Sequence, residues 1–566
     1  MYSNDKNSQY MIAMLKAYGI RYVVASPGGQ NIAFNAGVIS DSFFRCYSVI
    51  DERSAAYLAT GIAEETGEPV VITCTGSTSS RNYLPAMTEA FYRKLPIIAI
   101  TGTHVSNKYN QEPQFVDRTV TQNDVKVISV DIPVIKDDSD KFKALSLMHA
   151  ALTSVRRGPV HINLPNVWAD ALNISTQRLP DDVHAVDVIT GDTLNVNDIA
   201  KQMAGKNIGI FIGSHKKFSE RELDAISGFA QRFNAPVFCD HSSRYNGKNK
   251  ILTAQIADML DLPQCPDIMI DIGNVSAEYS SGRLFWGTKI WRISPDGNYC
   301  GRFHAPVFKL FDMSEIFFFE HMMAANIKTL LYYGQLKTLL DGIKYPDLPL
   351  SNALISQKMA EFMPHGSAIH LTSNCRRNMN FFNLDNSIDT FLNVGVCGID
   401  GSVSTMVGHS LMNPDRLYFV QLGDLAFFYD MNILGNRHIG KNLRILVINN
   451  NGGQEFRLYP EFRDKREMID NIIAASGHNR GGACGWAKSC GFVYMSASDK
   501  SEFLDKIRTF CTGEFDAPVL FEVFTTDADE KRGLEMMRTF NKTTVPGTEK
   551  KKTKLNMVKK LFKRGQ

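Results

Sequence analysis

The sequence lacks the features that identify membrane, secreted and zinc-binding proteins. No apolar run approaches the roughly 18–20 residues that a membrane span needs. The first residues lack the basic-then-apolar order of a signal peptide. The ten cysteines are scattered, without a Cys-x-x-Cys pair or a histidine cluster at zinc spacing. We therefore expect a cytoplasmic protein whose thiols are reduced.

A strong charge of either sign is also missing. The formal net charge is +3, with 44% hydrophobic and 21% charged residues, the balance of a globular protein. Residues 549–566 hold eight Lys or Arg and a single acid, Glu549, so the rest of the chain is mildly acidic. This excludes nucleic-acid binding over the protein as a whole. The basic tail, 546–566, is expected either to contact an anionic membrane surface, to dock on the acidic body or to be a solvated tail.

The length of 566 residues predicts three domains. Short apolar runs bounded by Gly or Pro alternate with helical patterns, as in buried parallel sheets. We predict α/β domains over 1–175, 193–335 and 350–545, giving three successive parallel-sheet α/β units. A helix is expected over Ser8–Tyr18, and strands at Tyr22–Ala25, Val70–Thr73, Ile97–Ile100, Val160–Asn163, Leu417–Leu422, Leu443–Asn449 and Val519–Phe524.

Two polar motifs in the third domain carry the strongest chemical signal. Gly423-Asp424-Leu425 follows an apolar strand and opens a helix, and Asn450, inside Asn449–Gly453, follows the next strand 26 positions later. Ligands of parallel sheets collect beyond the carboxyl ends of the strands. A carboxylate, an amide oxygen and a backbone carbonyl suit Mg²⁺ holding a diphosphate. Each half alone is more often a helix cap or an Asn-Gly turn, but together they favour the metal site.

At these residues the sequence resembles the thiamine-diphosphate enzymes, whose signature is Gly-Asp-Gly followed, after a gap in the high twenties, by Asn-Asn. The departure at Leu425 is shared with one branch, the menaquinone-pathway 2-succinyl-5-enolpyruvyl-6-hydroxy-3-cyclohexene-1-carboxylate synthases. The similarity covers roughly 20–170 and 350–525. Its other motifs are Ser26-Pro27-Gly28, Asp51-Glu52-Arg53, Leu84-Pro85-Ala86, Asn110-Gln111, Gly398-Ile399-Asp400-Gly401 and Gly452-Gly453-Gln454.

The resemblance implies a set of cofactor residues for thiamine diphosphate and Mg²⁺. Glu52 matches the glutamate that bonds the pyrimidine ring and promotes its proton relay; read from the sequence alone, it would be a helix cap. Ile399 matches the aliphatic residue that separates the two cofactor rings; otherwise it would be a core residue. The metal ligands would be Asp424, Asn450 and Gly452. The cofactor contacts would be Pro27, Gly28, Glu52, Gly398, Ile399, Gly423, Asp424, Leu425, Asn450, Gly452 and Gly453.

The substrate side departs from the branch. Gly29 and Gln30 replace its serine and arginine, His104 lies where it has Asp-Arg-Pro, and Val394 replaces an arginine. Ser373 and Arg377 match its serine and arginine in the third domain, with Arg376 as a competing register. Glu455 replaces an apolar residue and is either a catalytic acid/base or a solvated acid. The expected catalytic residues are Glu52, Gln111 and Glu455, and the expected substrate contacts are Gln30, His104, Asn110, Ser373, Arg377 and Phe456.

The expected activity is decarboxylation of a 2-oxo acid and transfer of the acyl carbanion equivalent to an acceptor. The alternatives are a simple decarboxylase releasing an aldehyde and a non-catalytic, cofactor-binding regulatory protein. The branch joins a succinyl unit from 2-oxoglutarate to isochorismate, which requires several carboxylate partners. Because three of those anchors are replaced, we expect a small donor acid and a less acidic acceptor. The resemblance also implies a homodimer or homotetramer, with the cofactor between two subunits.

Overall fold

The computed structural model describes the chain except for residues 1, 4–5, 18, 76–77, 94, 103–127, 155–159, 164–183, 261–264, 277–278, 286, 300, 302–304, 306, 396, 459–466, 469–470, 472–481 and 543–566. The chain forms two compact units. The first consists of Met1–Thr119, Val275–Ala277 and Asp347–Met536, and the second of Val120–Asn274, Glu278–Pro346 and Met537–Gln566. Among the described residues, no helix is long and apolar enough to cross a membrane.

The first domain, within the first unit, is built on a four-stranded parallel sheet in the order β2-β1-β3-β4. Strands β1 and β3 are largely apolar and buried, as expected for strands covered on both faces. The elements are α1 (Lys6–Ala17), β1 (Tyr22–Ala25), η1 (Gly29–Asn31), α2 (Ile32–Ser40), β2 (Arg45–Ser48), α3 (Glu52–Thr66), β3 (Val70–Thr75), α4 (Thr78–Asn82), α5 (Leu84–Arg93) and β4 (Ile97–Gly102).

The third domain, also in the first unit, has a six-stranded parallel sheet in the order β15-β14-β16-β17-β19-β18. The chain reverses its direction of growth between β14 and β16, where ligands of such sheets bind. The elements are α12 (Asn352–Phe362), β14 (Ala368–Leu371), α13 (Ser373–Met379), β15 (Asp389–Phe391), α14 (Ser402–Met412), β16 (Tyr418–Gly423), α15 (Asp424–Asp430), η7 (Met431–Gly435), β17 (Leu443–Asn449), α16 (Gln454–Leu458), α18 (Gly482–Ser489), β18 (Val493–Ala497), α19 (Lys500–Thr512), β19 (Val519–Phe524) and α20 (Asp527–Thr539).

The second unit contains a seven-stranded parallel sheet in the order β10-β9-β8-β11-β12-β13-β7 and a separate pair, β5-β6. Its central strand β11 and the neighbouring β8 are buried along their whole length. The elements are β5 (Ile128–Asp131), α6 (Asp138–Ser154), β6 (Val160–Asn163), β7 (Asp187–Thr190), η3 (Gly191–Thr193), α8 (Val196–Met203), β8 (Ile208–Ile212), α9 (Glu220–Arg232), β9 (Val237–Cys239), η4 (His241–Ser243), β10 (Lys250–Leu252), η5 (Gln255–Met259), β11 (Ile268–Ile272), η6 (Tyr279–Phe285), β12 (Lys289–Ile293), β13 (Val307–Asp312), α10 (Glu315–Met322), α11 (Tyr332–Leu340) and η9 (Phe540–Lys542).

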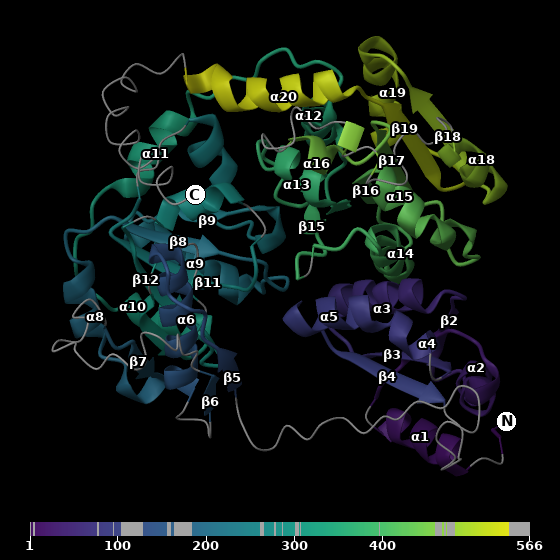
Figure 1. Cartoon of the computed structure of the whole chain (residues 1–566), viewed down its shortest axis with the longest axis horizontal. Helices are drawn as coiled ribbons and strands as arrows, with labels where there is room; N and C mark the ends of the chain where they lie inside the picture. The colour runs from purple at the N-terminus through teal and green to yellow at the C-terminus, as the bar shows by residue number, and fades with distance from the viewer. Residues whose placement is uncertain are drawn as a thin grey trace. The chain divides into compact units, whose positions relative to one another are not determined.

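These three sheets confirm the predicted fold class of three parallel-sheet α/β domains (Figure 1). The predicted strands are present within a residue or two of their expected bounds, and the helix expected over Ser8–Tyr18 is α1. The first domain was expected to extend to residue 175, but β5, α6 and β6 lie in the second unit. The expected boundaries at 175 and 545 lie outside the described residues and remain predictions.

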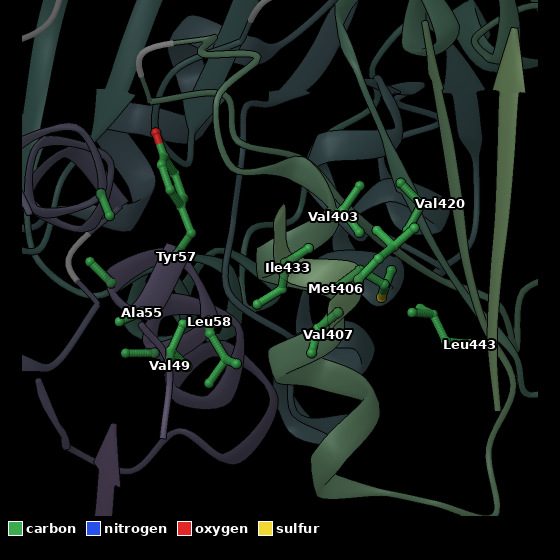
Figure 2. Packing of buried hydrophobic residues seen from close by; sticks show 14 of the residues in the cluster. Val49, Ala55, Tyr57, Leu58, Val403, Met406, Val407, Val420, Ile433 and Leu443 are labelled. Carbon is green, nitrogen blue, oxygen red and sulfur yellow. The ribbon is translucent and has the colours of Figure 1, made fainter. Parts of the chain in front are cut away.

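Within the first unit, α3 of the first domain and α14 of the third pack directly against each other (Figures 1 and 2). Glycine allows this close approach: a Cβ on Gly61 would overlap the carbonyl oxygen of Thr405, and one on Gly408 would overlap that of Leu58. Around the crossing, buried apolar side chains of both domains share one hydrophobic core. We call this contact the α3–α14 seam.

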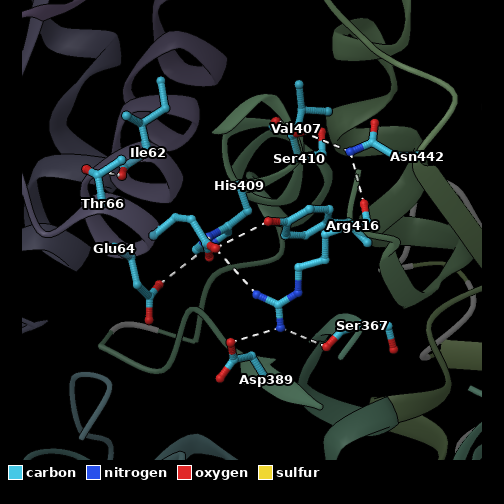
Figure 3. A network of polar contacts seen from close by, with 12 residues as sticks. Ile62, Glu64, Thr66, Ser367, Asp389, Val407, His409, Ser410, Arg416 and Asn442 are labelled. Atoms are coloured by element: carbon cyan, nitrogen blue, oxygen red, sulfur yellow. Dashed lines mark hydrogen bonds and ion pairs between the residues drawn. The ribbon is translucent and has the colours of Figure 1, made fainter. Parts of the chain in front are cut away.

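A polar network closes one end of the seam (Figure 3). His409 lies between Glu64 and Glu65, with its Nδ1 3.3 Å from Glu65 Oε2. Arg416 adds ion pairs to Glu65 at 3.4 Å and to Asp389 at 2.8 Å. Burial alone would raise the pKa of Glu65, but its bond to His409 and the nearby Arg416 outweigh that and hold the pKa below its ordinary value.

Candidate active site

Two neighbouring strand ends of the third domain bring the Gly-Asp and Asn-Asn motifs together. β16 and β17 pair in parallel with Gly423 opposite Ile448, so Asp424 and Asn450 emerge from the same edge of the sheet. Asp424 is the first residue of α15 and is 2% exposed. Its Oδ2 accepts a hydrogen bond of 3.0 Å from the Gly452 backbone N–H. This bond fixes the second motif onto the first.

The backbone of the second motif turns sharply at this edge. Asn451, Gly452 and Gly453 have φ values of +64°, +130° and +56°. The value at Gly452 is far outside the region that residues with a side chain adopt, so glycine is required there. On the first motif, a Cβ on Gly423 would meet no atom within 4 Å. The backbone at Gly423 is therefore accessible to a ligand such as a diphosphate.

Asn450 has the polar group at this edge that most needs a ligand. The residue is 9% exposed, and its Oδ1 is buried without a hydrogen-bond partner among the described residues. The neighbouring Asn449, by contrast, donates through Nδ2 to Glu522 at 2.7 Å. A buried acceptor without a partner costs about 1–3 kcal/mol. An amide oxygen beside the Asp424 carboxylate fits a hard cation such as Mg²⁺.

A metal ion at this edge would be coordinated by only one charged side chain, that of Asp424. In the described part of the chain, no group of three or more His, Cys, Asp or Glu side chains is placed to hold a metal ion. The corner formed by Asp424, Asn450 and Gly452 offers one carboxylate, one amide and one backbone carbonyl instead. Mg²⁺ is commonly bound by one or two carboxylates together with phosphate oxygens and water. The residues present therefore fit Mg²⁺ that is shared with a diphosphate.

The loop before α14 presents an aliphatic side chain to solvent. Ile399 is 41% exposed, so the alternative that it is a core residue is wrong. Cys397 has a φ of +52°, an uncommon value for a residue with a side chain. Asp400 accepts a hydrogen bond of 3.1 Å from the Tyr57 hydroxyl, and burial together with this carboxylate raises the pKa of Tyr57. The exposed position of Ile399 is suited to contact with a cofactor.

Glu52 begins α3 but does not cap it. The cap is Asp51, whose Oδ1 accepts from the Arg53 backbone N–H at 2.9 Å. The Glu52 carboxylate accepts instead from Asn82 Nδ2 at 3.2 Å. The structure thus assigns the role of cap to the neighbouring acid, which leaves Glu52 available for another role.

The remaining first-domain residues lie around the end of β1. Pro27 is the second residue after β1, and Gly28 N–H donates to Asn31 Oδ1 at 2.9 Å. A Cβ on Gly28 would overlap the methyl group of Thr75, so a larger residue would require that side chain to move. Gln30 lies in η1. Predicted contacts that lie outside the described residues are His104, Asn110 and Gln111.

Comparison with known proteins shows a similarity to thiamine-diphosphate enzymes. Residues 5–129 match the family "Thiamine pyrophosphate enzyme, N-terminal TPP binding domain". The 2-succinyl-5-enolpyruvyl-6-hydroxy-3-cyclohexene-1-carboxylate synthase of Bacteroides fragilis is 29% identical over 557 residues, which cover 94% of this chain and 99% of the relative. The enzyme of the same name from Phocaeicola vulgatus is 29% identical over 95% of this chain and 98% of its own length.

A solved structure supports the same fold. The thiamine diphosphate-dependent 4-hydroxybenzoylformate decarboxylase of Rhodococcus jostii RHA1 superposes with a TM-score of 0.60 at 18% identity, covering 92% of this chain and 99% of that one. The recognition of a thiamine-diphosphate enzyme is confirmed.

The expected substrate residues separate into two groups. Arg377 donates to both oxygens of Glu455, at 2.7 and 3.2 Å, so two residues predicted to act on the substrate are paired with each other. Ser373 begins α13 and lies instead beside Arg376, in a small pocket of the third domain. Phe456 lies in α16, but its side chain is outside the described part of the chain.

Two residues of the third domain were not predicted as site residues from the sequence. Arg376 was considered only as an alternative register to Arg377, and two consecutive arginines on a helix give no signal for which one turns inward. Asp430, fully buried at the end of α15, accepts from the Ser404 backbone N–H at 2.8 Å. Its burial raises its pKa to about 7. In the sequence, an acid six residues after Asp424 resembles any surface acid.

Proposed function

We propose that the protein binds thiamine diphosphate through Mg²⁺, decarboxylates a 2-oxo acid and transfers the remaining acyl unit to an acceptor. The observation that carries this proposal is the corner where Asp424 Oδ2 accepts from Gly452 N–H at 3.0 Å beside the unpartnered Oδ1 of Asn450. Asp424, Asn450 and the Gly452 carbonyl would hold the metal. The similarity to the relatives over almost the whole chain supports the same class of chemistry.

When bound, thiamine diphosphate supplies the carbon that attacks the oxo carbon and the electron sink for the pair left by CO₂. The protein's own residues bind, orient and move protons. Glu52 would hold the cofactor's pyrimidine nitrogen and exchange a proton with it. Exposed Ile399 would set the angle between the cofactor rings. Gly423 and Gly453 would give the diphosphate access to the backbone.

A homo-oligomer belongs to this proposal. The resemblance to the thiamine-diphosphate enzymes implies a cofactor between the first domain of one subunit and the third domain of another. Glu52 and the Asp424 corner would then complete each other across two copies. A dimer or tetramer is the expected state of the holoenzyme.

The donor would be a small 2-oxo acid and the acceptor less acidic than the one that the relatives' name implies. This is supported by Gly29 and Gln30 in the position of polar anchors and by Val394, which is 3% exposed and cannot pair with a carboxylate. Arg377 already has Glu455 as its partner. Buried carboxylates without partners are strongly unfavourable, so a substrate with several of them would bind poorly.

CO₂ release from a panel of 2-oxo acids, with purified protein, Mg²⁺ and thiamine diphosphate, tests the proposal. Release from at least one small acid is expected, and the products separate an aldehyde from a ligated ketone. Binding of the cofactor without CO₂ release from any acid would favour the regulatory alternative. Incubation with 2-oxoglutarate and isochorismate, followed by mass spectrometry, tests the substrate assignment, which efficient formation of the succinylated cyclohexene would overturn.

A further inference from the structure

A small polar pocket lies at the carboxyl ends of β14 and β15 in the third domain. It is partly open to solvent, and its walls come from the end of β14, the first turn of α13 and the loops after β15. β14 is the sheet neighbour of β16, which carries Asp424. The residues that define its chemistry are His370, Ser373, Arg376, Asn393, Cys397 and Gly398.

Arg376 is the charged group of this pocket. The residue is 3% exposed, and its Nε and Nη1 are buried without hydrogen-bond partners among the residues described. Arginine stays protonated in proteins. Burying guanidinium N–H groups without hydrogen-bond partners costs free energy, and the described residues that line the pocket supply no acidic side chain to offset that cost. Such a group is expected where a ligand supplies the missing negative charge.

The rest of the pocket fits an anion and not a cation. Of the described residues that line it, none is acidic. Burial lowers the pKa of His370 to about 4, so this imidazole is neutral at pH 7. Ser373 adds a hydroxyl donor on the same turn of α13 as Arg376. The planar guanidinium matches a carboxylate, which it can bind through two hydrogen bonds.

The neighbouring arginine does not offer this chemistry. Arg377 Nη2 is 2.7 Å from Glu455 Oε1, and its side chain is 12% exposed. The protein itself therefore supplies the carboxylate for Arg377. A substrate anion would have to displace Glu455 there, whereas at Arg376 the position is open.

We infer that the Arg376 pocket binds one carboxylate of the substrate that is not lost in the reaction. This inference rests on the proposed function. An ion pair with the reacting carboxylate would stabilise the charged ground state more than the transition state, in which that charge is leaving as CO₂, and would slow the step. The bound group is therefore the distal carboxylate of the donor or a carboxylate of the acceptor. Gly398, on the pocket wall, directly precedes Ile399, which places the pocket beside the expected cofactor position.

Binding of propionate, with propionamide as the uncharged control, tests the pocket without turnover. The holoenzyme is titrated at constant ionic strength, and the rise in melting temperature gives the affinity. Propionate and not propionamide is expected to stabilise the wild type. Arg376→Gln should weaken propionate by about 10- to 100-fold, the usual effect of losing a charge-assisted pair, and Arg376→Lys should restore part of it. The matched variant Arg377→Gln should change the affinity by less than about 3-fold.

The stability of the variant itself provides a second measurement. Because Nε and Nη1 of Arg376 are buried without partners among the described residues, Arg376→Gln should melt at the same temperature as the wild type or higher when no anion is present. A much lower melting temperature would show that the guanidinium is structural and overturn the inference. Equal propionate affinity in wild type and Arg376→Gln, or no propionate binding by the wild type, would also overturn it.

Steady-state assays distinguish the two sources of the carboxylate. If the donor supplies it, Arg376→Gln lowers the ratio of kcat/KM for 2-oxoglutarate over 2-oxobutyrate. If the acceptor supplies it, the variant lowers the consumption of a carboxylated acceptor relative to CO₂ release. Should the wild type release no CO₂ from any 2-oxo acid, the proposed function fails, while the propionate titration still decides whether the pocket binds a carboxylate.

Discussion

The α3–α14 seam and the β16–β17 edge are both buried, but their buried polar groups differ in how many hydrogen-bond partners they have. At the seam, Glu65 pairs with Arg416 and lies 3.3 Å from His409 Nδ1, His409 Nε2 lies 3.6 Å from Glu64, and glycines let the helices touch. At the edge, the Oδ1 atoms of Asn450 and Asn451 are buried without partners in the part of the chain that the structure describes. Structural polar groups are usually paired, so unpaired ones indicate where a ligand completes the protein.

The largest expected effect comes from removing Asp424, the expected metal-coordinating residue at the β16–β17 edge. Asp424→Ala should weaken thiamine diphosphate with Mg²⁺ by about 100-fold or more, since loss of even a supporting residue of a metal site costs about 10–100-fold. Calorimetric titration measures this. The matched control is Asp499→Ala, which removes the N-cap of α19 in the same domain, where Oδ1 accepts from Glu502 N–H at 2.9 Å. The control should lose about 1 kcal/mol of stability and keep its cofactor affinity. Wild-type cofactor binding by Asp424→Ala would rule out the metal site.

The second prediction concerns Glu52, the first residue of α3, and its expected role in the cofactor's proton relay. Glu52→Gln should keep the fold and bind cofactor, but lose about 10²- to 10⁴-fold in turnover because an amide cannot relay the proton. Exchange of the cofactor's thiazolium proton with deuterated water is the direct measurement. Glu68→Gln, an exposed acid just beyond the same helix, is the control. An unchanged exchange rate in Glu52→Gln would show that the residue has no part in the relay.

The seam should be sensitive to a single methyl group. Gly408→Ala places a Cβ against the backbone of Leu58, which cannot move aside without shifting α3. We expect a loss of about 2–3 kcal/mol in the free energy of unfolding. Gly485→Ala, also within a helix but with no atom within 4 Å of the new Cβ, should instead gain about 0.5–1 kcal/mol. Urea unfolding compares the two, and equal effects would mean that the seam is not tightly packed.

The open edge could be predicted from the sequence because local patterns define it. Asp424 and Asn450 each follow a buried apolar run, and parallel strands place such positions at one edge. The pairing of β16 with β17 then follows from the fold class. The sequence does not predict which of Asp51 and Glu52 caps the helix, because both are acids at the start of the same helix.

The seam and the pocket could not be predicted, since both depend on contacts between distant segments. Gly61 and Gly408 are 347 positions apart, and nothing local shows that their helices touch. The pairing of Arg377 with Glu455 depends on which way α13 and α16 face. Two residues were therefore each expected to meet the substrate, whereas the structure pairs them with each other.

Asp430 joins the two regions and gives the smallest and most specific prediction. It is fully buried, accepts from Ser404 N–H and Oγ at 2.8 and 2.6 Å, and lies 3.5 Å from Ser54 Oγ on α3. Its burial raises its pKa to about 7 from the model-compound value of 3.8. The folded protein therefore binds a proton that the unfolded chain has released, which stabilises the fold at low pH. This contribution is lost as pH rises from about 4 to about 7.

Asp430→Asn should remove that dependence. Relative to the wild type, the variant should gain about 1–2 kcal/mol between pH 5 and pH 8, because it carries no buried charge at either pH. The comparison uses urea unfolding at both pH values. Asp385→Asn is the control: hydrogen bonds from Ser387 hold the pKa of that exposed acid at about 2, so its removal should leave the slope between pH 5 and pH 8 unchanged. If Asp430→Asn keeps the wild-type slope, Asp430 is ionised throughout this range, and the α3–α14 seam contains a buried charge that its serine hydroxyls and amides fully compensate.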